Sequence, residues 1–175
     1  ARASHPALYD GGWHPTAVGG GVGAAVGAAA LLDAPREHAT AIALLRAGGV
    51  RAAFGSDGKS IQVGMAASSG VAAARLAAAG ARVPLESAVA GFELATGGRW
   101  AEPDPQRPAV AENWIKPWPC CLQTHGAIEA AEGLRGTDGP LTVVVHPVSL
   151  QAAAQGPEPA DGLRAKFSIP YLTAY

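Results

Sequence analysis

The sequence predicts a mainly helical protein, and its composition carries that prediction. Of its 175 residues, 40 are alanine and 23 are glycine, whereas only ten are phenylalanine, tryptophan or tyrosine. Alanine is the best helix former and small side chains let helices pack closely, so this mixture favours helices over a β-sandwich. A chain of this length holds one ordinary domain with an apolar core, or a large piece of a bigger protein.

Four helices are predicted in the first hundred residues, and the first of them follows His14. Pro15 stands where a first helical turn accepts proline, and a run rich in glycine and alanine extends from there to Leu32. Within this run glycine recurs at every fourth position, at Gly19, Gly23 and Gly27. Residues at this spacing share one helix face, so the pattern predicts a glycine stripe that lets another backbone approach closely.

The second predicted helix has a cap at Asp33 and a first-turn proline at Pro35, and the pair Gly48–Gly49 ends it. The third begins with Ser60 as its cap and ends at Gly80. Along this third helix, spacings of three and four residues place an apolar and small-residue set on one face: Ile61, Met65, Ser68, Ala72 and Leu76.

The fourth predicted helix is shorter and spans Glu86–Ala95, with Val89 and Phe92 pointing inward. Gly97–Gly98 follows it and interrupts the helical pattern.

A proline-rich connection over residues 101–111 is the predicted domain boundary. It separates a partial helical domain, residues 1–100, from a partial small α+β domain, residues 112–175. In the second domain a helix is predicted over Thr124–Leu134 and a β-branched strand over Leu141–Val145.

Charge and hydropathy exclude two classes of partner. The formal net charge is −1, so no basic face for nucleic acid is expected. Thr16–Leu32 is mostly glycine and alanine and is shorter than the ~20 strongly apolar residues of a bilayer crossing, so no membrane partner is expected. The start of the chain has no signal-peptide pattern, and the adjacent Cys120 and Cys121 cannot form a disulfide framework, so we expect a cytoplasmic protein.

Two of the three lysines, Lys59 and Lys116, stand at predicted helix starts rather than on solvated helix faces. A lysine beside free helical N–H groups makes a receptor for carboxylate or phosphate. The alternative is an ordinary solvated surface lysine. Two such positions in one chain favour an anion-binding function.

His14 directly precedes a predicted helix, where the helix dipole would lower its pKa and favour a neutral imidazole. It is therefore a candidate general base. The alternative is a histidine that caps the helix and packs against Trp13. The same two interpretations apply to His125, which opens the predicted helix that follows Lys116. Cys120, Cys121 and His125 lack the CxxC spacing of a metal site, so no metal is expected.

Five segments, in their order and separations, resemble the MmgE/PrpD family: GWHPT at 12–16, FGSDGKS at 54–60, KPWPCCLQTH at 116–125, VHPVSLQ at 145–151 and AKFSIPY at 165–171. This family includes 2-methylcitrate dehydratase, cis-aconitate decarboxylase and related epimerases. Its common chemistry is proton removal next to a carboxylate. The resemblance implies a large all-helical domain followed by a small α+β lid, with the active site in the cleft between them, usually in a homodimer, and no cofactor.

The resemblance also implies roles for single residues. His14, Lys59, Lys116 and Tyr171 match the family's active-site histidine, its two motif lysines and the tyrosine near the end of the FSLPY segment. The lysines would neutralise substrate carboxylates and the enolate-like charge, while imidazole or phenol moves the proton. Three further residues are expected to contact substrate: Cys121, where some members carry a catalytic histidine, His125, which matches a later histidine of the same segment, and Gln62.

The sequence departs from the family at Gln62, where members often carry a histidine three residues after the loop lysine. The matched segments correspond to the central portion of a family member. Helices with an Asp, Thr and His segment of the catalytic site are therefore expected to lie outside this sequence.

Three hypotheses follow. The first is a cofactor-independent lyase or isomerase, foremost a dehydratase of a 2-methylcitrate-like di- or tricarboxylate, in which Lys59 and Lys116 bind carboxylates and His14 carries the proton. The second is a truncated, non-catalytic binding or assembly module. The third is a split enzyme in which a second chain supplies the missing helices. The expected partners are accordingly a small carboxylate substrate and either a second copy or a second chain.

Overall fold

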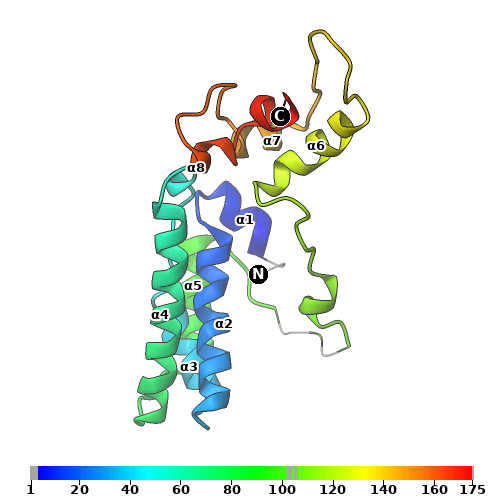
Figure 1. Ribbon diagram of the computed structural model, residues 1–175. Helices are drawn as coiled ribbons and strands as arrows, with labels where there is room; N and C mark the ends of the chain where they lie inside the picture. The colour runs from blue at the N-terminus through cyan, green and yellow to red at the C-terminus, as the bar shows by residue number, and fades with distance from the viewer. Residues whose placement is uncertain (1–3, 102–103, 105, 175) are drawn as a thin grey trace. The chain divides into compact units, whose positions relative to one another are not determined.

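A computed structural model gives the structure of the chain and describes residues 4–101, 104 and 106–174 (Figure 1). The described backbone consists of helices and loops, and strand-like pairing within it is limited to two isolated bridges, Trp13 with Val50 and Ala154 with Ser168. The predicted, mainly helical fold is confirmed. The chain divides into two compact units, residues 1–104 and residues 105–175.

The first unit places its described α-helices in the order α1 (His5–Asp10), α2 (Pro15–Leu31), α3 (Arg36–Leu44), α4 (Gly58–Ala78) and α5 (Leu85–Thr96). The last four match the four predicted helices. Local signals explain two of the ends: a proline occupies the first turn of α2, and Gly97 closes α5 in the left-handed conformation at φ 67°. Within the described residues, no helix is both long and apolar enough to cross a membrane.

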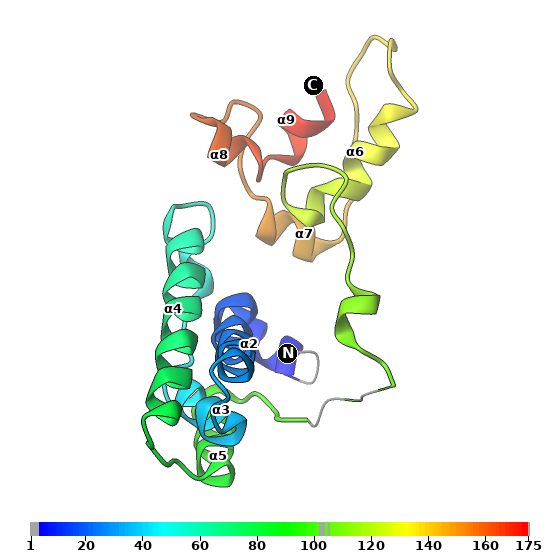
Figure 2. The same cartoon turned by 60° about the horizontal axis from the view of Figure 1, so that its bottom comes forward.

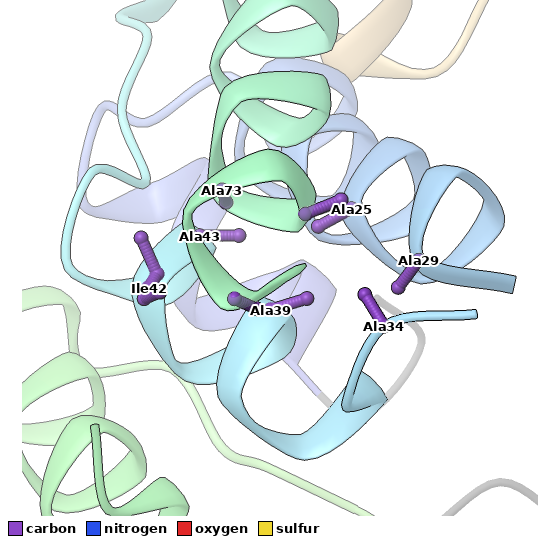
Figure 3. Packing of buried hydrophobic residues seen from close by; sticks show 9 residues of the cluster. Ala25, Ala29, Ala34, Ala39, Ile42, Ala43 and Ala73 are labelled. Carbon is purple, nitrogen blue, oxygen red and sulfur yellow. The ribbon is translucent and has the colours of Figure 1, made fainter. Parts of the chain in front are cut away.

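Helices α2 and α4 lie side by side and run in the same direction (Figure 1, Figure 2). Helix α3 packs against both of them, and α5 packs against α3. The cluster between α2, α3 and α4 is built almost wholly from alanine: Ala25, Ala29, Ala34, Ala39, Ile42, Ala43, Ala73, Ala74 and Ala77. Figure 3 shows these small side chains meeting between the three helices. A second cluster, formed around Leu8, Leu44 and Phe92, joins α1 and α5 to the same bundle.

The close helix approach predicted for the first helix occurs, but on another face. A Cβ added at Gly23 or Gly27 would meet nothing within 4 Å, so these two members of the predicted stripe do not make the contact. The contact is made by Gly21, where an added Cβ would lie 3.2 Å from the carbonyl oxygen of Ala66. Gly21 is buried together with Ala25, which lies one turn further along α2. The four-residue spacing places these glycines on one helix face. It does not say which face of the helix packs against a neighbour.

The larger apolar side chains of α4 point away from the bundle. Ile61, Met65 and Leu76 are 57%, 67% and 51% exposed, whereas Gly70 and Ala73 are buried. Small residues permit a shorter distance between helix axes, and the alanine cluster is formed at that distance. The periodic set on the third predicted helix is therefore a surface face.

Two predicted caps are wrong. Asp33 does not cap α3: it adopts a positive φ of 50° just after α2, and the N–H of Ala34 then donates to the carbonyl of Ala29 at 2.9 Å, which closes α2. Pro35 occupies the N-cap position of α3 instead. Ser60 lies inside α4, because the helix begins two residues earlier, at Gly58.

The second unit contains shorter helices: α6 (His125–Glu132), α7 (Pro147–Ala152), α8 (Gly162–Ala165) and α9 (Ile169–Ala174). Helix α6 confirms the helix predicted over Thr124–Leu134. Its small core joins Ala127, Ala153 and Ile169. In the predicted linker, residues 102, 103 and 105 lie outside the described residues, and residues 109–112 form one 3-10 turn.

The strand predicted over Leu141–Val145 is wrong. The segment forms no ladder with any described residue, although its burial alternates: Val143 and Val145 pack against the small core while Val144 is 91% exposed. A β-strand needs a neighbour that exchanges backbone hydrogen bonds. The burial of the segment alternates as it would in a strand, but the described chain offers no pairing partner.

Candidate functional site

His14 is positioned by a short backbone pairing between two loops. Its N–H donates to the carbonyl of Gly49 at 2.9 Å, and the N–H of Arg51 donates to the carbonyl of Gly12 at 2.8 Å. The bridge between Trp13 and Val50 lies between these two bonds. The pairing sets the segment that precedes α2 against the loop that follows α3, and it buries the His14 side chain to 3% exposure.

His14 is the N-cap residue of α2, but only through its backbone. Its carbonyl accepts the N–H groups of Ala17 and Val18 at 3.0 and 3.1 Å, while its side chain makes no capping hydrogen bond. The imidazole instead meets the ring of Phe54 edge-on, with 4.8 Å between the ring centres and an angle of 80° between the planes. The side chain therefore contacts Phe54, in the loop that precedes α4.

Gln62, one turn into α4, links His14 to the paired loop. Its Oε1 accepts the N–H of Val50 at 2.9 Å, and its Nε2 donates to the Val50 carbonyl at 3.1 Å. The same Nε2 lies 2.5 Å from Nδ1 of His14. The glutamine that replaces the expected histidine therefore contacts the imidazole directly.

Lys59 lies in the first turn of α4, with its Nζ 4.4 Å from the centre of the Phe54 ring. The ring thus has a cation over it and the imidazole at its edge. Burial lowers the pKa of His14 from its ordinary value, and the positive charge of Lys59 lowers it further. Both causes favour a neutral imidazole.

Because α2 and α4 run in the same direction, their N-terminal ends lie at the same end of the bundle (Figure 1). Each helix N-terminus carries partial positive charge from its unpaired N–H groups. His14 and Lys59 stand at these two ends. The arrangement of a neutral imidazole, an ammonium and two helix N-termini suits an anionic ligand.

The second unit holds the other lysine motif. Nζ of Lys116 donates to the carbonyl of Cys120 at 3.0 Å. The fully buried Thr124 secures the same turn, because its Oγ1 donates to the carbonyl of Cys121 at 2.7 Å and lies 3.1 Å from Sγ of Cys120. The backbone N–H of Cys121 donates to the carbonyl of Lys166 at 2.9 Å, which ties this turn to the later part of the unit.

His125 opens α6, and its side chain is buried at 8% exposure. Its ring meets Trp118 edge-on at 5.2 Å and 89°. Within the described part of the chain, Nε2 of His125 is buried without a hydrogen-bond partner. A buried polar atom in this state is costly, so the position is one where a polar group of a ligand or of another segment would be stabilising.

Tyr171 lies in α9, half-buried, and its backbone N–H donates to Oγ of Ser168 at 3.1 Å. The open cavities of this unit are lined in part by α6, α9 and residues 141–146, and the sequence-predicted site residues are not among their lining. Among the residues that the structure describes, no three His, Cys, Asp or Glu side chains lie close enough together to hold a metal ion.

The structure therefore brings His14, Lys59 and Gln62 together in the first unit. Lys116, Cys121, His125 and Tyr171 belong to the second unit, where the first two share one turn. Sequence reasoning missed Phe54 and Val50, on which the first group is assembled. Phe54 is part of the FGSDGKS segment, so the motif could have identified it. Val50 acts through its backbone N–H and carbonyl, which no motif identifies.

The fold and the site together define an alanine-rich helical domain that presents an imidazole and an ammonium group at the N-terminal ends of two parallel helices. Residues 1–93 match the family model of the MmgE/PrpD N-terminal domain. The match covers more than half of the chain, and the chain belongs to the MmgE/PrpD family. Neither a curated protein sequence nor a solved structure gives a significant match.

Proposed function

We propose that this chain carries catalytic residues of a cofactor-independent lyase or isomerase that acts on a small di- or tricarboxylate. The reaction class is proton removal next to a carboxylate, and dehydration of a 2-methylcitrate-like substrate is the first case to test. Family membership supports the class. The observation that carries the proposal is the convergence of His14 and Lys59 on Phe54.

Electrostatics explain why these groups suit the chemistry. Removing a proton next to a carboxylate builds negative charge on that carboxylate, and a fixed cation lowers the cost of this charge. Lys59 supplies the cation beside two helix N-termini, so an anion is favoured at this end of the bundle. The neutral imidazole beside it still carries one N–H group, which can donate a hydrogen bond to the anion.

The second lysine motif is proposed to bind a substrate carboxylate. Lys116 is held by the carbonyl of Cys120, in the turn that also carries Cys121, and His125 follows that turn. Tyr171 is proposed to move a proton through its phenol. These roles come from the family motifs that the residues match.

The experiment that tests the proposal is proton NMR of the purified chain with a panel of di- and tricarboxylates in D₂O. It detects a new product and also the entry of deuterium at the carbon next to a carboxylate. Lys59→Ala and Lys116→Ala are measured beside the wild type. Lys166→Ala serves as the matched control, because Lys166 is exposed and touches the Cys121 turn only through its backbone carbonyl, which alanine keeps.

Product formation or deuterium exchange that is lost in Lys59→Ala and Lys116→Ala, and kept in Lys166→Ala, supports the proposal. Equal rates in all four proteins would rule out the assigned lysines. No reaction of the wild type with any carboxylate would favour a binding module or a split enzyme, and co-purification of a second polypeptide would distinguish these two.

A further inference from the structure

We propose that Gln62 holds His14 in a single tautomer, the neutral imidazole with its hydrogen on Nε2, so that His14 meets the substrate as a hydrogen-bond donor. The tautomer follows from the contacts around Gln62. The role toward substrate rests on the proposed function.

The orientation of the Gln62 amide is fixed by Val50. A backbone N–H can only donate and a backbone carbonyl can only accept. The Gln62 oxygen must therefore face the Val50 N–H, at 2.9 Å, and the Gln62 NH₂ group must face the Val50 carbonyl, at 3.1 Å. Turning the amide over would set donor against donor and acceptor against acceptor, so both bonds would be lost.

With the amide fixed in this way, the tautomer of His14 follows. The Gln62 NH₂ group has two hydrogens and no acceptor capacity. One hydrogen is directed to Val50 and the other to Nδ1 of His14. Nδ1 must then accept, and the hydrogen of a neutral imidazole must be on Nε2. An imidazolium would place N–H against N–H at this contact.

The loop that orients Gln62 is itself held tightly. Gly49 has a φ of +113°, a conformation that favours glycine. A Cβ added there would lie 2.6 Å from the Cβ of Ala17 and 3.3 Å from Oε1 of Gln62. Val50 is bridged to Trp13 on the other side. The Val50 backbone, which orients the Gln62 amide, is therefore held both by the conformation of Gly49 and by the pairing with Trp13.

This arrangement changes the role expected for His14. A neutral imidazole with Nε2–H and a blocked Nδ1 has no nitrogen free to take a proton. It can donate a hydrogen bond from Nε2 to a carboxylate or enolate oxygen. In the family's usual pattern a histidine occupies the position of Gln62, and the glutamine cannot titrate. Gln62 is therefore a positioning residue, and proton abstraction belongs to a side chain other than His14.

The test is a long-range ¹H–¹⁵N NMR spectrum of the histidine rings in the ¹⁵N-labelled chain, recorded at pH 7.5 without substrate. The chain supplies two internal references. His38 has Nδ1 2.9 Å from the carbonyl of Val83, so it must carry its hydrogen on Nδ1. His146 accepts the N–H of Val148 at Nδ1, so it must be the opposite tautomer. The expected pattern for His14 is that of His146, and a His38-like pattern or an even mixture would overturn the proposal.

Gln62→Glu gives the sharper comparison. The carboxylate can still accept the Val50 N–H, but its second oxygen is an acceptor toward both the Val50 carbonyl and His14. The bond to the Val50 carbonyl is lost, and His14 should acquire a hydrogen on Nδ1. Gln151→Glu, an exposed position on α7, is the matched control and should leave the His14 signals unchanged. An unchanged His14 tautomer in a folded Gln62→Glu chain would contradict the proposal, and the wild-type spectrum decides it if that variant does not fold.

The spectrum is read without any substrate, so the two proposals fail separately. Absence of turnover with every carboxylate leaves the tautomer result intact. A wrong tautomer would remove the donor role of His14 even where the chain turns over a substrate.

Discussion

Gly70 of α4 packs directly against the backbone of α2 at Gly21. A Cβ added at Gly70 would meet the carbonyl oxygen of Gly21 and would lie 2.7 Å from the Cβ of Ala24 and 2.8 Å from the backbone nitrogen of Ala25. The neighbours are mostly backbone, which cannot move aside as a flexible side chain would. The distance between the two helices that carry His14 and Lys59 is therefore set at this contact.

Gly70→Ala is expected to destabilise the chain by about 1–3 kcal/mol, because the added methyl group forces the two helices apart. Thermal unfolding followed by circular dichroism measures the change. Gly64→Ala is the matched control on the same helix, since nothing lies within 4 Å of a Cβ there. It should raise stability by about 0.5–1 kcal/mol, because alanine is the better helix former.

Gly27→Ala distinguishes the observed contact face from the glycine stripe predicted by spacing. An added Cβ meets nothing within 4 Å at Gly27, so this variant should behave like Gly64→Ala. A loss of stability similar to that of Gly70→Ala would show that the stripe, and not Gly21, faces a neighbour.

Lys59→Ala is expected to lower kcat/KM by about 10²–10³-fold on whichever carboxylate is turned over, since it removes a fixed cation from the developing charge. Stability should change little, because the cation–π contact with Phe54 is worth about 0.5–1 kcal/mol where exposed. Lys166→Ala should keep the wild-type value. A fall in kcat/KM that merely follows a fall in the melting temperature would point to a structural role for Lys59.

The stability of the chain should depend on pH through His14. Its pKa is lowered in the folded chain by burial and then by Lys59. The unfolded chain, with an imidazole pKa of about 6.5, therefore binds more protons in the range just below that value, and the free energy of unfolding falls as the pH drops through it. Urea unfolding at a series of pH values should show this slope in the wild type and a smaller slope in His14→Gln.

Removing the charge of Lys59 should raise the pKa of His14 only part of the way to its ordinary value, because burial is the larger cause. An NMR titration of Lys59→Met measures this. Arg75→Gln, in the last turn of the same helix, is the matched control. At about 1.5 Å per residue it lies well beyond the Debye length of about 8 Å, so the His14 titration should not move.

Thr124→Val should destabilise the second unit by about 1–3 kcal/mol, since it removes the fully buried Thr124 hydroxyl that donates to the Cys121 carbonyl. Thr137→Val deletes the same kind of bond, Oγ1 to the Leu134 carbonyl at 2.7 Å, at an exposed position. Its effect should stay within about 0.5 kcal/mol. Amide hydrogen exchange of α6 measures the loss of stability in each of the two variants. Equal losses would mean that burial of the hydroxyl does not determine the cost of removing its hydrogen bond.

Helices α2 to α6 were predictable from the sequence because their determinants are local, whereas the short helices α1, α7, α8 and α9 were not predicted. Alanine propensity, the first-turn proline at Pro15 and the terminating Gly97 act within one or two turns. The predictions were wrong at Asp33 and over Leu141–Val145, because the tertiary surroundings outweighed the local preference of these residues. Asp33 closes one helix instead of opening the next, and the β-branched segment has no described partner strand.

The residues of the candidate site could be named from motifs, but their contacts could not. His14 and Gln62 are 48 positions apart, and they meet because α4 packs along α2 with Gly70 against Gly21. The orientation of the Gln62 amide depends on a backbone N–H and a backbone carbonyl of Val50, groups that every non-proline residue carries and that no motif can single out. The sequence by itself determined helices α2 to α6, the family and the identity of the charged and imidazole groups. Only the tertiary structure decided which helix faces meet and which nitrogen of His14 carries its hydrogen, because packing distance and hydrogen-bond direction depend on atoms brought together by folding.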